Sequence, residues 1–282
     1  MLEKIIFHNC GYYLSYFSPS SILMYFFTFL MLSRIRSISL RQNWFIPFFP
    51  LYFGLMFATL FFVFLNGSDS SYPSSEKSVP ILILGALNPF GRNGKVMYGA
   101  YFGSIVGILI ANSLFKRESL SKFLDISAIS ASLSFSIWRI GCFIGGCCYG
   151  IPNEIFGIRF YQSTAAHAKL RNTPLVSGEY TVPLIPTQLI SSIGDFLIFL
   201  FLLTLFRKNR TSYPYFYFFA QAFLYGIGRF TVEFFRMDPR EIWGPLSMSQ
   251  WLSLVLVAAG LIFFIKNRKE ISESFKKDSR NS

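Results

Sequence analysis

Residues 42–68 read QNWFIPFFPLYFGLMFATLFFVFLNGS, a run of 27 residues without Lys, Arg, Asp or Glu. About 20 mainly apolar residues suffice for a helix to cross the hydrocarbon layer of a bilayer. Six further stretches are either free of these charges or carry isolated ones. The predicted spans are residues 12–33, 44–65, 96–115, 123–144, 186–206, 213–235 and 246–265. The sequence therefore predicts an all-α integral membrane protein with about seven transmembrane helices.

The composition of the whole chain agrees with this class. Of its 282 residues, 52% are apolar, 19% are aromatic and only 14% are charged. An average soluble domain carries about 25% charged residues. A soluble globule of this size could not cover so much apolar surface, and a disordered chain would be far less apolar. Both classes are excluded.

The distribution of Lys and Arg predicts the orientation. With the N-terminus outside, 15 of the 26 Lys and Arg residues fall in inner segments and nine fall outside. The remaining two, Arg139 and Arg229, lie within predicted spans. Because inner loops carry the excess of basic residues in membrane proteins, we expect the N-terminus outside and the C-terminus in the cytoplasm. We expect the first span to be retained, because it lacks a signal-peptide cleavage pattern.

The segments between the spans give the remaining organisation. Residues 78–91 contain Pro80 and Pro89 and are short for a span, so they are interpreted as interfacial or re-entrant. Residues 145–185 form the longest outer loop and predict a small extracytoplasmic cap. No internal repeat is visible, and residues 1–282 are interpreted as one polytopic membrane domain. The net charge of +12 is carried by loops flanking spans, which favours anionic lipid over nucleic acid as its partner.

Ionisable residues inside spans are costly, so each one is a functional hypothesis. Tyr225, Arg229, Glu233 and Arg236 follow at spacings of four, four and three, which place them on one helix face. A structural Arg229–Glu233 pair is the simplest interpretation. It leaves a second buried arginine, Arg139, unexplained on another span.

Two buried arginines with one clear carboxylate leave positive charge that an anion would neutralise. The planar guanidinium binds phosphate through two hydrogen bonds, so arginines at head-group depth predict a phospholipid phosphate as ligand. Asp195 also lies within a predicted span, but the sequence identifies no partner for it.

Residues 139–150 read RIGCFIGGCCYG and contain Cys142, Cys147 and Cys148. Small buried thiols that only pack are the favoured interpretation. A disulfide stays open because the outer face can be oxidising, and a zinc site is disfavoured because the spacing is not a standard one. No metal or cofactor is expected. His8 and His167 have no partner pattern, so a Ser-His-Asp site cannot be argued.

Four blocks of sequence together resemble the bacterial prolipoprotein diacylglyceryl transferase family over roughly residues 44–266. The blocks are 94–103 (GKVMYGAYFG), 139–150, 186–189 (PTQL), and 225–236 (YGIGRFTVEFFR) continued by 246–253 (LSMSQWLS). The last block is the most similar to the family pattern. The family transfers diacylglycerol from phosphatidylglycerol to the cysteine thiol of a prolipoprotein signal peptide, forming a thioether and releasing glycerol phosphate, in the bacterial inner membrane.

The resemblance implies roles for particular residues. Arg139 and Arg229 would hold the phosphate, Glu233 would orient Arg229, and Tyr225 and Gln188 would donate hydrogen bonds to the glycerol part. Tyr98 occupies the position of the family's histidine and is the catalytic candidate there. The other expected substrate-binding residues are Gly99, Gly141, Cys142, Gly150 and Arg236.

The chain also departs from the family pattern. Tyr98 replaces a histidine, Cys142 an asparagine and Cys147 a glutamate, so the phosphate-binding half matches and the thiol-activating half is altered. A tyrosine titrates near pH 10 and is a poor base at neutral pH. The leading hypothesis is a diacylglyceryl transferase. The alternatives are a phospholipid-binding paralogue with another acceptor or no transferase activity, and, least favoured, a transporter, since transporters often contain repeats.

Overall fold

The computed structural model describes residues 10–35, 46–66, 97–115, 120–208, 211, 213–238 and 242–280. The helices are α2 (Cys10–Ile35), α3 (Phe48–Asn66), α5 (Met97–Phe115), α6 (Leu120–Gly145), α7 (Ala165–Leu170), α8 (Thr187–Arg207), α9 (Phe216–Glu233), α10 (Met248–Lys266) and α11 (Arg268–Arg280). Two short antiparallel hairpins pair β1 (Val176–Ser177) with β2 (Tyr180–Thr181), and β3 (Ile242–Trp243) with β4 (Leu246–Ser247). The predicted all-α class is confirmed over these residues.

Three helices of the described part, α6, α8 and α10, are long and apolar enough to cross a membrane. Large apolar side chains such as Ile193 and Phe201 on α8 and Val255 on α10 are exposed. Exposed apolar helix faces of this kind are typical of contact with lipid. The total number of spans and their orientation stay predictions, and the segment 78–91 lies outside the described residues.

The chain divides into two units, residues 29–127 and residues 1–28 together with 128–282. In the first unit, α5 packs directly on α3. A Cβ atom on Gly99 would lie 2.5 Å from the main-chain oxygen of Phe57, so only glycine permits this approach. Ser104 adds a hydrogen bond from its hydroxyl to the Pro50 carbonyl at 3.0 Å.

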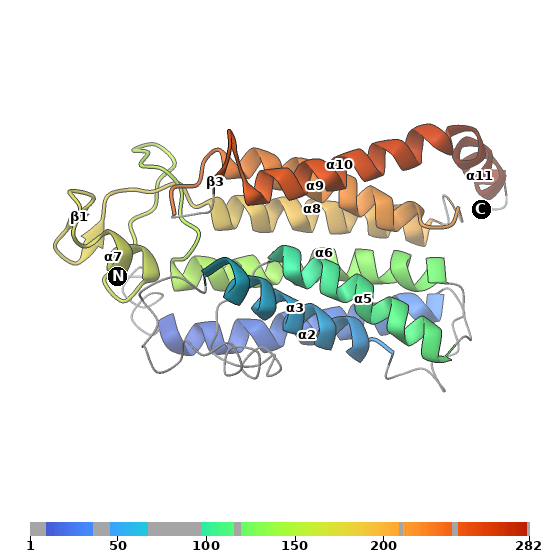
Figure 1. Ribbon diagram of the computed structural model, residues 1–282, viewed down its shortest axis with the longest axis horizontal. Coiled ribbons are helices and arrows are strands. Elements are labelled where there is room, and N and C mark those ends of the chain that lie inside the picture. The colour runs from blue at the N-terminus through green and yellow to red at the C-terminus, as the bar shows by residue number, and fades with distance from the viewer. Residues whose placement is uncertain are drawn as a thin grey trace. The chain divides into compact units, whose positions relative to one another are not determined.

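In the second unit, α8, α9 and α10 lie side by side (Figure 1). The rings of Phe219 on α9 and Phe263 on α10 stack with their centroids 4.2 Å apart. Helix α8 is joined to α6 by a hydrogen bond from the Ser192 hydroxyl to the Ser136 carbonyl at 2.8 Å. These contacts bring the ends of α6 and α9 and the beginning of α8 into one region.

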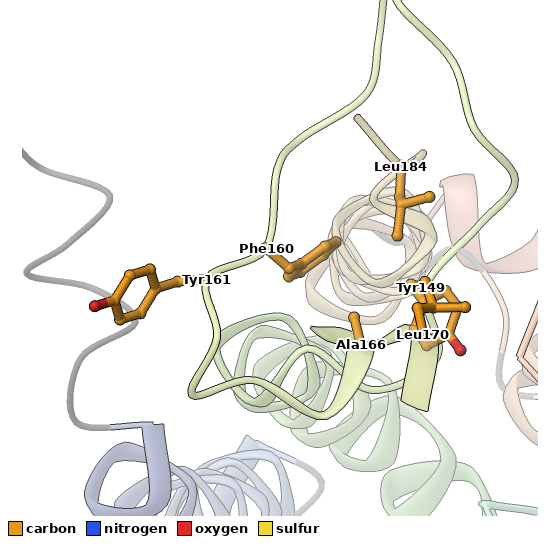
Figure 2. Close-up of a cluster of buried hydrophobic side chains, with 6 residues drawn as sticks. All are labelled: Tyr149, Phe160, Tyr161, Ala166, Leu170 and Leu184. Atoms are coloured by element: carbon orange, nitrogen blue, oxygen red, sulfur yellow. The ribbon is translucent and has the colours of Figure 1, made fainter. Parts of the chain in front are cut away.

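Residues 146–186, between α6 and α8, form a small cap with its own apolar core. The core consists of Tyr149, Phe160, Tyr161, Ala166, Leu170 and Leu184. Figure 2 shows Phe160 and Leu184 pointing toward one another, with Tyr161 on the opposite side of its strand-like segment. Main-chain hydrogen bonds between Ile158 and Leu184, at 2.9 and 3.0 Å, hold the two arms of the cap together. This core fixes the segment that leaves α6 and the segment that enters α8.

Candidate active site

The C-terminal turn of α9 carries a buried ion-pair network. Arg229 Nη1 lies 2.8 Å from Glu233 Oε2, and Arg236 Nη1 lies 3.6 Å from the same oxygen. Spacings of four and three along the helix bring these side chains to one face, as the sequence predicts. Glu233 is only 3% exposed, so its charge depends on these partners.

The start of α10 braces this network. The Ser247 hydroxyl donates to Glu233 Oε1 at 2.9 Å, and it also accepts from the Gln250 amide as the N-cap of α10. Arg229 Nη2 donates to the Ser249 hydroxyl at 3.2 Å. Sequence reasoning gave neither serine a role. The Ser-x-x-Gln capping-box pattern at 247–250 was the signal that marks a helix start there.

Arg236 has a carboxylate of its own. Its Nε and Nη2 atoms donate to the two oxygens of Asp238 at 2.9 and 2.7 Å, a bidentate pair. Asp238 was also missed, because it lies beyond the end of α9, where helical spacing no longer predicts contacts. The ion-pair network therefore consists of Arg229, Glu233, Arg236 and Asp238.

Arg139 approaches from α6 and is 4% exposed. It interacts electrostatically with Asp195 on α8 and with Tyr225 on α9. Arg139 lies six residues before the end of α6 and Asp195 eight residues after the start of α8. At about 1.5 Å per residue, both lie roughly 9–12 Å along their helices from the same end of the unit.

Asp195 changes the charge balance expected from the sequence. It interacts favourably with both Arg139 and Arg229, so the buried arginines have more than one carboxylate and the expected excess of positive charge is smaller. The two arginines nonetheless repel each other. The Nε groups of both lack a hydrogen-bond partner in the part of the chain that the structure describes. These unpartnered buried donors make the two arginines candidates for binding an anion.

The loop after α6 is fixed by its own main chain. Gly146 adopts a φ of +65°, and the amides of Gly146 and Cys147 bond back to the carbonyls of Phe143 and Cys142 at 3.0 and 3.1 Å. This Schellman arrangement ends the helix. Thr187 Oγ1 donates to the Cys148 carbonyl, and Gln188 Nε2 donates to the Cys147 carbonyl at 2.6 Å.

Gln188 thus bonds to the protein main chain, whereas the resemblance implies a hydrogen bond to the glycerol part of the lipid. Its amide nitrogen holds the loop, while its Oε1 has no hydrogen-bond partner among the described residues. Gly150 likewise has a main-chain role. A Cβ atom there would lie 2.6 Å from the Phe235 carbonyl oxygen and 2.7 Å from that of Ile185. Gly141 lies buried in the last two turns of α6.

Three thiols gather where α6 ends. Cys142, Cys147 and Cys148 are free cysteines, and this set is called the thiol cluster below. The Cys147 thiol donates to the Cys142 carbonyl at 3.6 Å. Hydrogen bonds with Cys142 and Cys148 raise the pKa of the Cys147 thiol. Hydrogen bonds with Cys142 and Cys147, followed by the positive charges of Arg236 and Arg139, lower the pKa of the Cys148 thiol. Among the described residues, no group of three or more His, Cys, Asp or Glu side chains is arranged so that it could hold a metal ion.

Tyr98 and Gly99 belong to the other unit, residues 29–127, where both lie on α5 and are buried. The site described above is formed by residues of the second unit alone. The structure thus brings together Arg139, Cys142, Gln188, Tyr225, Arg229, Glu233 and Arg236 of the predicted set, with Asp195 added.

The chain is similar to proteins of one known family. A family model described as prolipoprotein diacylglyceryl transferase matches residues 16–266. A phosphatidylglycerol–prolipoprotein diacylglyceryl transferase 2 from Clostridium perfringens (strain 13 / Type A) is 37% identical over 190 residues, which cover 64% of this chain and 67% of that protein.

Two further relatives carry the name phosphatidylglycerol–prolipoprotein diacylglyceryl transferase. The protein of Clostridium tetani (strain Massachusetts / E88) is 37% identical over 61% of this chain and 64% of its own length. The protein of Clostridioides difficile (strain 630) is 31% identical over 78% of this chain and 77% of its own length. The chain thus spans about two thirds of the first two relatives and more than three quarters of the third.

Proposed function

The chain belongs to the prolipoprotein diacylglyceryl transferase family, and we propose that it transfers the diacylglyceryl group of phosphatidylglycerol to the lipobox cysteine of prolipoproteins. The reaction forms a thioether and releases glycerol phosphate. Phosphatidylglycerol and the signal peptide of the prolipoprotein are the two substrates. No cofactor is part of the proposal.

One observation carries the assignment of the phosphate site. Arg139 and Arg229 are buried on different helices and repel each other, while the Nε group of each has no protein partner in the described part. A phosphodiester placed between them would accept these hydrogen bonds and replace the repulsion by two attractions. Phosphate matches the planar guanidinium groups, which bind it through two parallel hydrogen bonds.

The same arginines fit the chemistry of the step. As the acceptor sulfur attacks the glycerol carbon, charge develops on the departing phosphate. Preorganised donors in a site without bulk water stabilise such charge strongly. Glu233 keeps Arg229 in place through the 2.8 Å ion pair, and Ser247 keeps Glu233 in place. Tyr225, which lies beside Arg139, is the residue we assign to the glycerol part.

The proposal also assigns a place and an orientation. We place the protein in the bacterial inner membrane with seven spans, the N-terminus outside and the C-terminus in the cytoplasm. The cap then lies on the outer face, where prolipoproteins present their lipobox cysteine. The basic residues of the inner loops support this orientation. The exposed apolar faces of α8 and α10 support insertion in a membrane.

The test is a transfer assay with purified protein, phosphatidylglycerol vesicles and a signal peptide that carries one lipobox cysteine. We expect a diacylglyceryl mass gain on the peptide, measured by mass spectrometry. Arg229→Ala should reduce the rate by about 10²–10³ or more, because it removes a donor to the leaving phosphate. Arg159→Ala, an exposed arginine of the cap, is the matched control and should leave the rate unchanged.

Two results would contradict the proposal. Normal transfer by Arg229→Ala would refute the phosphate role. A wild-type protein that binds phosphatidylglycerol but adds no mass to the peptide would instead favour a phospholipid-binding paralogue with another acceptor. Tyr98, Cys142 and Cys147 differ from the family pattern, and this difference is the reason for considering the second function.

A further inference from the structure

Helix α10 carries a stripe of exposed apolar side chains along its whole length. The stripe consists of Trp251, Leu254, Val255, Leu261, Ile262 and Ile265, which are between 38% and 67% exposed. Steps of three and four residues, or their sums, connect these positions, so they lie on one face of the helix. A face of this kind is unfavourable in water and favourable against lipid.

The two ends of this stripe differ in their chemistry. Trp251 stands at the end where α10 meets the ion-pair network, and the exposed Lys266, Arg268 and Lys269 stand at the other end. From Trp251 to Lys266 the helix extends about 22 Å. Long basic side chains reach further toward water, and the hydrocarbon layer is about 30 Å thick. A tryptophan at one boundary and basic residues at the other are typical of a membrane span.

A second tryptophan is fixed at the same boundary. The indole Nε1 of Trp251 donates to the Trp243 carbonyl at 3.0 Å, which ties β3 to the first turn of α10 (Figure 1). The hairpin pairs Trp243 with Leu246, and Gly244 between them has a φ of +67°. Trp243 is 53% exposed. An exposed indole is most favourable where one of its sides is apolar and the other is wet, as at the surface of a bilayer.

The first turn of α10 also reaches the ion-pair network. Ser249 accepts a hydrogen bond from Arg229 Nη2 at 3.2 Å. Ser249 and Trp251 are two residues apart, so their side chains leave the helix about 200° apart around its axis. One face of this turn therefore holds Arg229, and the opposite face carries Trp251. The depth of the tryptophans in a bilayer would fix the depth of Arg229.

We propose that Trp243 and Trp251 form an interfacial anchor, which binds the head-group region of the outer leaflet and holds Arg229, through Ser249, at the depth of the lipid phosphate. The occupant of this surface is the bilayer itself. Both tryptophans are positioning residues, because they act on the substrate through Arg229. The role of Arg229 in this inference rests on the proposed transferase function, whereas the binding of the anchor to lipid does not.

The depth of the anchor can be measured without turnover. Replacing Trp44 and Trp138 by phenylalanine leaves Trp243 and Trp251 as the only tryptophans of the chain. The protein is reconstituted in vesicles of phosphatidylcholine and phosphatidylglycerol that carry a spin label either near the head group or in the middle of an acyl chain. We expect the shallow label to quench the fluorescence more strongly than the deep one. Equal or stronger quenching by the deep label, or quenching by aqueous acrylamide alone, overturns the inference.

The link to Arg229 is tested by Trp243→Ser, which removes the indole and keeps the carbonyl that Trp251 binds. The KM for phosphatidylglycerol in vesicles should rise by about three- to tenfold, because the segment holding Arg229 spends less time at the competent depth. The kcat at saturating lipid should stay within about twofold of the wild type, as expected when binding alone is weakened. Trp243→Tyr, which keeps an amphipathic ring, should restore most of the wild-type KM.

Phe156→Ser is the matched control. Phe156 is an aromatic residue of the cap that is 74% exposed, and its removal should leave KM unchanged. Thermal unfolding in detergent shows whether Trp243→Ser is folded. Trp251→Phe, which keeps a ring but loses the N–H donor, is the second variant and should raise KM in the same direction.

The outcomes separate the inference from the proposed function. A wild-type KM in both Trp243→Ser and Trp251→Phe, or an equal rise in Phe156→Ser, refutes the link between the anchor and Arg229 and leaves the proposed function intact. A wild-type protein that transfers no lipid refutes the proposed function, and the quenching measurement then still decides whether the anchor binds lipid.

Discussion

The ion-pair network at the end of α9 and the thiol cluster at the end of α6 lie in the same unit and are held in opposite ways. In the ion-pair network, charged side chains hold one another, and Ser247 and Ser249 hold them from α10. In the thiol cluster, side chains of α8 hold the main chain by hydrogen bonds to the carbonyls of Cys147 and Cys148, whereas no ion pair in the described part of the chain holds the cysteine side chains. The neighbouring Arg139, like Arg229 in the network, keeps an unpartnered Nε group among the described residues.

This difference separates two tasks. The ion pair with Glu233 keeps the Arg229 guanidinium in one orientation, although its Nε group has no partner among the described residues. A fixed guanidinium is the condition for electrostatic stabilisation of a leaving group. A region with unpartnered polar groups can bind a ligand through those groups. Backbone strain like that at Cys148, which has a φ of +61°, concentrates at functional sites, which favours the same interpretation. We therefore expect the ion-pair network, called the α9 side, to fix the orientation of Arg229, and Arg139 with the thiol cluster, called the α6 side, to meet the substrates.

Beyond the Arg229→Ala test, the largest effect is expected on the α6 side, at Arg139. Arg139→Ala removes a guanidinium whose role no residue of the ion-pair network can take over, so the transfer rate should fall by about 10²–10³. The affinity for phosphatidylglycerol should fall as well, since both arginines bind the phosphate before it leaves. The transfer assay and a vesicle-binding measurement check the two effects.

Arg139→Lys sharpens the same comparison. A lysine keeps the charge but loses the planar fork, so it should restore only a small part of the rate. If Arg139→Ala and Arg159→Ala proved equally active, Arg139 would be a structural partner of Asp195 and the phosphate would be bound by the α9 side alone.

The sequence predicted the α9 side well and the α6 side poorly, for a physical reason. Arg229, Glu233 and Arg236 lie on one helix, and helical spacing alone brings them together. The structure has a helix over each of the seven apolar stretches. These helices could be predicted because the length of an apolar stretch is a local property of the sequence. Asp195 acquires its partners only when α8 packs beside α6 and α9, which no local spacing reports. The seven-span topology and the cap's outer location remain predictions.

The loop residues show the same limit in another form. The glycines of residues 139–150 indicated close approach, and Gly150 indeed separates the carbonyls of Phe235 and Ile185. The left-handed conformation of Cys148 could not be predicted, because it is enforced by Thr187 and Gln188, about 40 residues away. Packing of the three cysteines was favoured from the sequence and stays a prediction. The sequence places Arg139 three residues before Cys142, but the charge of Arg236 on Cys148 could not be predicted, because it depends on a segment about 90 residues away.

A smaller effect is expected where the two regions meet, at Gly150. This residue bonds to Ile185 and lies between its carbonyl and that of Phe235, next to Arg236. Gly150→Ala places a Cβ atom against two main-chain oxygens, so the backbone must shift and the free energy of unfolding should fall by about 1–3 kcal/mol. Thermal unfolding in detergent measures this change.

Gly194→Ala provides the matched control for that substitution. Gly194 lies within α8, and a Cβ atom there would meet nothing within 4 Å. Alanine should leave stability unchanged or raise it by up to about 1 kcal/mol, because glycine is unfavourable in a helix. Equal stability of Gly150→Ala and Gly194→Ala would show that the two regions are not joined through Gly150.

The smallest effect is expected at Ser247, which supports the ion-pair network from α10 through its hydrogen bond to Glu233. Ser247→Ala removes both the cap of α10 and the hydrogen bond to Glu233, so the free energy of unfolding should fall by about 1 kcal/mol. Thr164→Ala removes the cap of α7, where Thr164 lies against Gly146, and should cost a similar amount. The two variants should differ in catalysis: only Ser247→Ala releases Glu233, and through it Arg229, so only its kcat should fall. If kcat is equal in both, the ion pairs hold Arg229 without help from α10, and the rigidity of the α9 side comes from its charges alone.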